Sequence, residues 1–209
     1  TGSGCLLRAL LAELPAASGV GVDVSAAALA VARHNALVLR LADRAAWVQG
    51  NWSEAISGTF DLVVANPPYV AEAELSRLAP EVARFEPRLA LNGGADGLDS
   101  LRALGPGLAK LASLDSIILI EIGAEQATSA SALLINYGLR DVKIIKDLSG
   151  HARCLAARAG GDDKKAWNRY SSRLLSEAVR GCQAVQPTDA SHGANKPADI
   201  SHISGCPQV

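Results

Sequence analysis

The stretch Asn66-Pro67-Pro68-Tyr69 directly follows the apolar run Phe60-Asp61-Leu62-Val63-Val64-Ala65. A continuous run of β-branched and aliphatic residues bounded by turn formers is typical of a strand buried on both faces, so the tetrapeptide is predicted to lie at a strand's carboxyl end. The two prolines fix φ and remove two backbone donors. The Asn66 side chain and a carbonyl beside the prolines can therefore accept both N–H groups of a flat amide, while the Tyr69 ring covers its face. The alternative is a strand-ending turn with no further role.

Length and composition bound the class of protein. The 209 residues are 49% hydrophobic and 20% charged with a formal net charge of −1, which fits one globular domain with an appendage. The near-neutral balance argues against a broad nucleic-acid-binding face. No apolar run approaches the ~20 residues of a membrane span and no signal peptide is recognisable, so we expect a cytoplasmic protein that does not contact membranes. The scattered cysteines and histidines predict neither a disulfide framework nor a metal site.

Two segments near the start of the chain have the pattern of a nucleotide-binding unit. The turn Thr1-Gly2-Ser3-Gly4 leads into an apolar helix at 6–14, and its glycines let the backbone approach a ligand at the helix amino terminus. The segment 19–24 is a predicted strand that carries Asp23, and an acid at this place accepts hydrogen bonds from ribose hydroxyls in such folds. The alternatives are an ordinary turn and an acid that favours a helix amino terminus.

Trp52 follows a third predicted strand at 46–50. An aromatic ring at this place could stack on a purine, with Asn51 bonding the purine edge. Trp52 could equally be a packed residue at the rim of the sheet, and the sequence leaves both interpretations open.

The remaining chain alternates strands and helices. This order predicts a doubly wound α/β sheet with its ligand outside the carboxyl ends of the strands. The predicted strands are 60–65, 117–122, 142–146 and 153–157, and the predicted helices are 72–84 (interrupted at Pro80), 98–111 and 126–134. Because the glycine turn, Asp23, Trp52 and Asn66 all fall at one edge of this sheet, we predict a ligand site there.

The character of the chain changes beyond Gly160. We predict a domain at 1–160, then an amphipathic helix at 161–182 with Trp167 and Tyr170 on its apolar face. The segment 183–209 has few large apolar residues and is predicted to be disordered.

Seven segments, in this order and spacing, resemble the release factor glutamine methyltransferases, also called the HemK or PrmC family. They are Thr-Gly-Ser-Gly-Cys (1–5), Gly-Val-Asp-Val-Ser (21–25), Gly-Asn-Trp (50–52), Asn-Pro-Pro-Tyr-Val (66–70), Pro-Glu-Val-Ala-Arg-Phe-Glu-Pro (80–87), Leu-Asn-Gly-Gly-Ala-Asp-Gly-Leu-Asp (91–99) and Leu-Ile-Glu-Ile-Gly-Ala-Glu-Gln-Ala (119–127). The resemblance runs from Thr1 to about Arg158. Asn-Pro-Pro-Tyr alone is less specific, because DNA adenine methyltransferases and other amino-group methylases share it.

The resemblance implies a class I fold with an antiparallel last strand that binds S-adenosylmethionine. It also implies methylation of the glutamine side chain in the Gly-Gly-Gln motif of peptide chain release factors. Thr1, Gly2, Ser3 and Gly4 would then line the methionine end of the cofactor, Asp23 would hold the ribose, and Trp52 would lie near the adenine. Asn66, Pro67, Pro68 and Tyr69 would hold the glutamine amide and form the catalytic set, with Asn66 also beside the cofactor. Arg84 and Glu86 would belong to the wall that accepts the release-factor loop.

The sequence also departs from the family. It shows neither the amino-terminal helical domain nor the first strand of the sheet, so we expect two neighbouring strands with unpaired edges. Three alternatives remain beside release-factor methylation: a ribosomal-protein glutamine methyltransferase, a nucleic-acid adenine methyltransferase, and an inactive truncated remnant. The oligomeric state is not predicted.

Overall fold

The structure is a computed structural model that describes residues 1–159, except for the side chains at 114 and 115. The helix predicted at 161–182 and the tail predicted at 183–209 lie outside the described residues. The helices are α1 (Cys5–Glu13), α2 (Ala26–Val38), α3 (Pro80–Phe85), α4 (Arg88–Leu91), α5 (Asp99–Leu111) and α6 (Ala127–Asn136), with short 3-10 helices at Ala42–Arg44 and Glu72–Arg77. The strands are β1 (Gly19–Asp23), β2 (Ala45–Gln49), β3 (Phe60–Ala65), β4 (Ala112–Glu121), β5 (Leu139–Lys146) and β6 (Ala152–Ala159).

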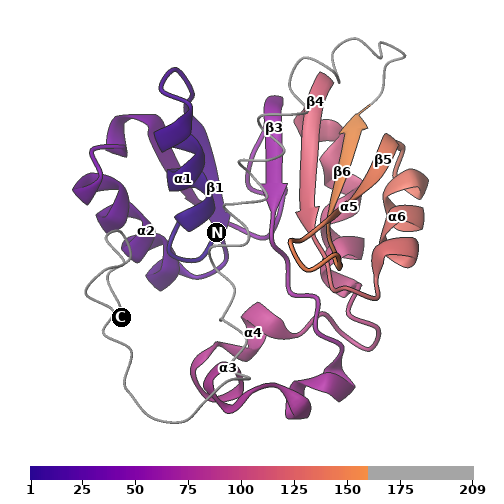
Figure 1. Cartoon of the computed structure of the whole chain (residues 1–209). Helices are drawn as coiled ribbons and strands as arrows, with labels where there is room; N and C mark the ends of the chain where they lie inside the picture. Colours follow the sequence, from indigo (N-terminus) through magenta and orange to yellow (C-terminus); the bar gives the residue numbers. More distant parts are fainter. Residues whose placement is uncertain (160–209) are drawn as a thin grey trace.

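The strands form two sheets. β1 pairs with β2 in parallel, and a second sheet has the order β3-β4-β6-β5 (Figure 1). β3 and β4 are parallel, whereas β6 runs antiparallel to both β4 and β5. This arrangement confirms the α/β class with an antiparallel last strand. Among the described residues β1 and β3 each pair on one side only, as expected for a sheet without its first strand.

Alternate side chains of β4 belong to two separate hydrophobic clusters, one on each face of the four-stranded sheet. Ile118 and Ile120 are fully buried and pack with Leu108 of α5 and Leu134 of α6, so these two helices cover one face of the four-stranded sheet (Figure 1). Ile117 and Leu119 belong to a separate cluster on the opposite face, because successive residues of a strand point to opposite sides.

The segment predicted as one helix at 72–84 has a different structure. A 3-10 helix covers Glu72–Arg77, the chain is extended at Leu78 and Ala79, and α3 starts at Pro80. The proline thus begins a helix rather than interrupting one. The reason is that a residue before proline disfavours the helical region, while proline itself fits the first helical position, where no donor is needed.

None of the helices in the described part of the chain is long and apolar enough to cross a membrane. Residues 1–159 also contain no group of three or more His, Cys, Asp or Glu side chains arranged to hold a metal ion.

Candidate active site

Of the predicted cofactor residues, the glycine turn and Asp23 meet at the carboxyl end of β1. The backbone N–H of Gly2 donates to Oδ2 of Asp23 at 2.8 Å, and the N–H of Ser25 donates to Oδ1 at 2.9 Å. Ser25 also caps α2, because its hydroxyl accepts from the N–H of Ala28. We call Thr1–Gly4 together with Asp23 the cofactor group.

The Asp23 carboxylate is held in its ionised form. Partial burial of the side chain would by itself raise its pKa, but the backbone hydrogen bonds from Ser25 and Gly2 act against that effect, and the pKa lies below its ordinary value. An ionised carboxylate offers about four acceptor positions, so Asp23 can accept from ribose hydroxyls in addition to these backbone groups.

Gly4 must be a glycine for two reasons. Its φ is +80°, and a Cβ built there would lie 2.5 Å from the Trp47 ring. The ring of Trp47 also lies over Gly21 of β1, where a Cβ would be 2.6 Å from it. Trp47 thus fixes the turn against the two-stranded sheet.

Trp52 has different surroundings. Its backbone is left-handed with φ 49°, and its half-buried side chain packs against the cluster that α5 and α6 form with the larger sheet. This contact matches the packed-rim interpretation. Its assignment to the adenine remains a prediction.

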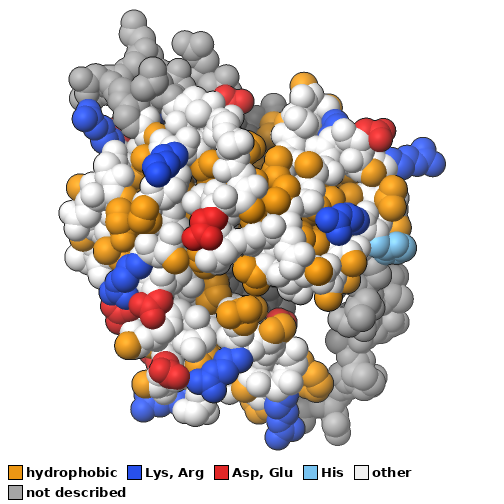
Figure 2. Space-filling view, turned by 180° about the vertical axis from the view of Figure 1, so that it is seen from behind, with side chains coloured by type: hydrophobic (Ala, Val, Ile, Leu, Met, Phe, Trp, Pro, Cys, Tyr) orange, Lys and Arg blue, Asp and Glu red, His pale blue; other side chains and the backbone are white. Residues whose placement is uncertain are grey.

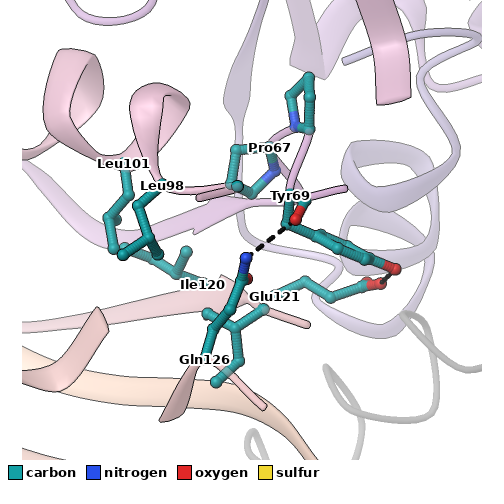
Figure 3. A pocket seen from close by; sticks show the side chains of 10 residues that line it. Pro67, Tyr69, Leu98, Leu101, Ile120, Glu121 and Gln126 are labelled. Atoms are coloured by element: carbon teal, nitrogen blue, oxygen red, sulfur yellow. Dashed lines mark hydrogen bonds between the residues drawn. The ribbon is translucent and has the colours of Figure 1, made fainter. Parts of the chain in front are cut away.

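The second set of predicted site residues, Asn66–Tyr69, leaves the carboxyl end of β3 and is called the acceptor group here. Asn66 is exposed, whereas Pro67 is buried. The Tyr69 hydroxyl donates to Oε1 of Glu121 at 3.2 Å, and Glu121 is only 4% exposed at the end of β4 (Figure 3). The acceptor group is therefore fixed beyond Asn66, while the Asn66 side chain is accessible.

The loop 91–99 packs along the acceptor group. Val70 and Asn92 form a parallel bridge, in which the Val70 N–H donates to the Leu91 carbonyl at 3.0 Å and the Gly93 N–H donates to the Val70 carbonyl at 2.8 Å. The side-chain amide of Gln126, just before α6, reaches the Tyr69 carbonyl at 2.9 Å (Figure 3).

Glu121 and Gln126 were not predicted as site residues. Both lie in the segment 119–127 that carries part of the family resemblance, but no local pattern assigned either of them a role. Their position in the sequence could have indicated a role at the site. Glu121 ends a parallel strand and Gln126 comes just before the next helix, and ligands bind at this edge of such folds.

Arg84 and Glu86 are exposed at the end of α3 and just after it. α3 and α4 lie beyond the carboxyl ends of β3 and β4 (Figure 1). Arg88 of α4 pairs with Glu72 at 3.1 Å, which ties this lobe to the segment after Tyr69. The role of Arg84 and Glu86 in binding a substrate remains a prediction.

Basic and acidic side chains are mixed over the face seen in Figure 2, including the lobe that carries α3 and α4. This face therefore shows no continuous basic surface of the kind that binds nucleic acid.

A family model matches the first part of the chain, and relatives align with most of the residues that the structure describes. The family model described as Methyltransferase small domain matches residues 1–85. The release factor glutamine methyltransferase of Rhodospirillum rubrum is 48% identical over 158 residues, which is 76% of this chain and 49% of that protein. The enzyme of the same name from Caulobacter vibrioides is 47% identical over 153 residues, 73% of this chain and 53% of that protein. The chain thus spans about half the length of the curated relatives it matches.

Solved structures agree on the fold. The ribosomal protein L11 methylase of Lactobacillus delbrueckii superposes with a TM-score of 0.54 at 21% identity, over 77% of this chain and 67% of that chain. The catalytic domain of human Mettl16, solved in complex with an RNA hairpin, superposes with a TM-score of 0.56 at 19% identity, over 78% and 62% of the two chains. The absence of a nucleic-acid partner therefore remains an expectation for this chain.

The structure has the fold of the class I methyltransferases, and the methyl donor of that class is S-adenosyl-L-methionine. An ionised acid at the tip of β1, bonded to a glycine turn before a helix, suits the hydroxyls of that donor, so the residues present fit the cofactor. Within this class the chain is similar to the release factor glutamine methyltransferases, which are 44–48% identical to it over about three quarters of its length.

Proposed function

We propose that this chain catalyses methyl transfer from S-adenosyl-L-methionine to the side-chain nitrogen of the glutamine in the Gly-Gly-Gln motif of peptide chain release factors. The names of its relatives support the release factor as substrate. The structural observation that carries the proposal is the acceptor group: an exposed Asn66 at the end of β3, followed by two prolines and an anchored Tyr69.

The chemistry of the substrate explains why such a group is needed. The lone pair of a carboxamide nitrogen is delocalised into its carbonyl, so the nitrogen is a poor nucleophile, and no side chain can deprotonate it at neutral pH. The cofactor, when bound, supplies a methyl group on a positively charged sulfur. The protein must hold the nitrogen still and direct its lone pair toward that methyl group.

Asn66 and the backbone near Pro67 can do this by accepting hydrogen bonds. The Asn66 side-chain oxygen would accept one N–H of the glutamine, and a carbonyl next to the prolines would accept the other. The Tyr69 ring would pack on the face of the amide. Positioning of this kind can lower a barrier by up to roughly 7–11 kcal/mol in ideal cases.

We assign no general base. The nitrogen carries a positive charge once it is methylated, and its proton is then acidic enough to leave to water. The function of the protein side chains is therefore to accept hydrogen bonds and to orient the amide, which are functions that neutral groups such as Asn66 can perform.

Three acceptors compared side by side test the proposal. The chain is incubated with cofactor that carries a labelled methyl group and with a release factor, the same release factor with Gly-Gly-Glu in place of Gly-Gly-Gln, or an oligonucleotide that contains adenine. We expect label only in the first. Label in the Gly-Gly-Glu protein would exclude that glutamine as the acceptor, and label in the oligonucleotide would favour the adenine methyltransferase.

A further inference from the structure

Gln126 stands directly before α6 and joins three segments that are distant in sequence. Its Oε1 accepts from the Gly123 N–H at 2.9 Å, while its Nε2 donates to the Tyr69 carbonyl at 2.9 Å and to the Asp96 carbonyl at 3.4 Å. These partners belong to the turn after β4, the acceptor group and the loop 91–99. Figure 3 shows the side chain pointing directly at Tyr69.

The partners dictate the orientation and the chemistry of this side chain. A backbone N–H faces one end of the amide and two carbonyls face the other, so the oxygen must point to Gly123 and the nitrogen to Tyr69. Only a primary amide meets both demands. A glutamate in its place would keep the acceptor toward Gly123 and put a negative charge against two carbonyl oxygens.

The junction is also tightly packed. Gly97 has φ +75°, and a Cβ built there would lie 2.3 Å from Nε2 of Gln126 and 2.3 Å from the Tyr69 carbonyl oxygen. The backbone of the loop 91–99 therefore touches the amide and the acceptor group at one point. A side chain cannot enter, and the three segments cannot shift independently.

Tyr69 is thus fixed at both its ends. Gln126 holds its carbonyl, and Glu121 accepts from its hydroxyl. Only two residues, Pro67 and Pro68, separate Tyr69 from Asn66, and each proline has a fixed φ. Because few dihedrals are free to absorb a movement, a displacement of Tyr69 reaches Asn66.

From this geometry we propose that Gln126 is a positioning residue of the acceptor site, which sets the place of Tyr69 and through it that of Asn66. The inference rests on the proposed function for its catalytic consequence, but the anchoring itself is a property of the free protein. Gln126 acts through Tyr69 and lies outside the cofactor group, so its loss affects turnover and leaves cofactor binding intact.

The test compares Gln126→Ala and Gln126→Glu with Ser129→Ala. Ser129 is a matched control because its exposed hydroxyl lies in the first turn of α6 and donates to the backbone carbonyl of Gln126 rather than to its side-chain amide. Turnover of a release factor, its KM, the affinity for S-adenosylhomocysteine and hydrogen exchange of the segments 66–72 and 92–98 are measured for each variant. A displaced reacting group costs up to roughly 100-fold, so we expect kcat to fall about 10- to 100-fold in both Gln126 variants, with cofactor affinity unchanged.

The same two variants are expected to exchange faster in both segments, and Ser129→Ala is expected to behave as the wild type in every measurement. Unchanged exchange in the Gln126 variants would overturn the proposal whether or not the wild type is active. Equal losses of kcat and of cofactor affinity would overturn it too, since a general structural defect would then explain both. A wild type that does not methylate release factors, with faster exchange in the variants, would refute the proposed function and leave the anchoring by Gln126 established.

Discussion

The backbone N–H of Gly2 lies 2.8 Å from the carboxylate of Asp23, 21 residues further along the chain. This bond joins the glycine turn before α1 to the tip of β1, so the two parts of the cofactor group form one unit. The same bond, together with that from Ser25, holds the pKa of Asp23 below its ordinary value against the opposing effect of burial. Asp23 is therefore a charged acceptor at neutral pH.

Asp23→Asn should weaken the binding of S-adenosylhomocysteine. The substitution keeps the shape but removes the charge and one acceptor, and a hydrogen bond to a charged group is worth about 1.5–3 kcal/mol. Calorimetric titration should show a loss of affinity of roughly 10- to 100-fold. Asp43→Asn is the control, because Asp43 is exposed in the 3-10 helix that precedes the amino end of β2, whereas Asp23 lies at the carboxyl end of β1. An equal loss of affinity in Asp43→Asn would show that Asp23 does not bind the cofactor.

Gly4→Ala should destabilise the fold more than Gly58→Ala. Both glycines have positive φ, which costs an alanine about 1–2 kcal/mol, but only at Gly4 would the new Cβ meet the Trp47 ring, while Gly58 faces open space. Overpacking adds about 1–3 kcal/mol. Urea unfolding measures the difference, and adding Trp47→Leu to Gly4→Ala should recover part of it. Equal losses at both glycines would mean that the ring does not restrict the turn.

Asn66→Ala should separate turnover from cofactor binding. Its side chain is exposed at the end of β3 and makes none of the contacts that hold Tyr69. We expect kcat toward a release factor to fall by about 100-fold with little change in S-adenosylhomocysteine affinity or in thermal stability. Asn136→Ala, at the exposed end of α6, serves as the control. Parallel losses of turnover and cofactor affinity would show that Asn66 belongs to the cofactor group.

The loop 91–99 should lose an ion pair at acid pH. Hydrogen bonds from Arg102, at 2.5 and 2.8 Å, lower the pKa of Asp96 from 3.8 to about 2. Because the pKa of Asp96 is lower in the folded than in the unfolded protein, its ionised carboxylate stabilises the fold at pH values above the unfolded pKa of about 3.9. This stabilisation is lost as the pH falls through the folded pKa.

The destabilisation caused by Asp96→Asn should therefore be constant near neutral pH and shrink from about pH 4 downwards. Carbon-detected NMR titration of the Asp96 carboxyl group checks the same point directly. A midpoint at the ordinary 3.8 would contradict the pairing with Arg102.

The sequence was sufficient to predict the features that depend on local pattern. The apolar run before Asn66 identified β3, and the short strand before Ser25 placed Asp23 at the end of β1, because strand ends and helix caps are signalled by adjacent residues. The antiparallel last strand came from the family resemblance and is confirmed by the pairing of β6.

Contacts between distant segments could not be predicted in this way. Glu121 and Gln126 meet Tyr69 across 52 and 57 residues, and that meeting depends on the register between β3 and β4, which no local pattern specifies. Trp52 illustrates the same limit, because an aromatic residue after a strand suits a ligand site and a hydrophobic cluster equally well, and its contacts with the cluster of α5 and α6 became known only from the fold.

Tandem mass spectrometry of a release factor after incubation with this chain and S-adenosyl-L-methionine tests the central claim most directly. The account predicts one added methyl group on the side-chain nitrogen of the glutamine in Gly-Gly-Gln, in an amount that drops when Asn66→Ala replaces the wild type. A methyl group on any other residue, or an unmodified release factor alongside saturable binding of S-adenosylhomocysteine, would contradict it.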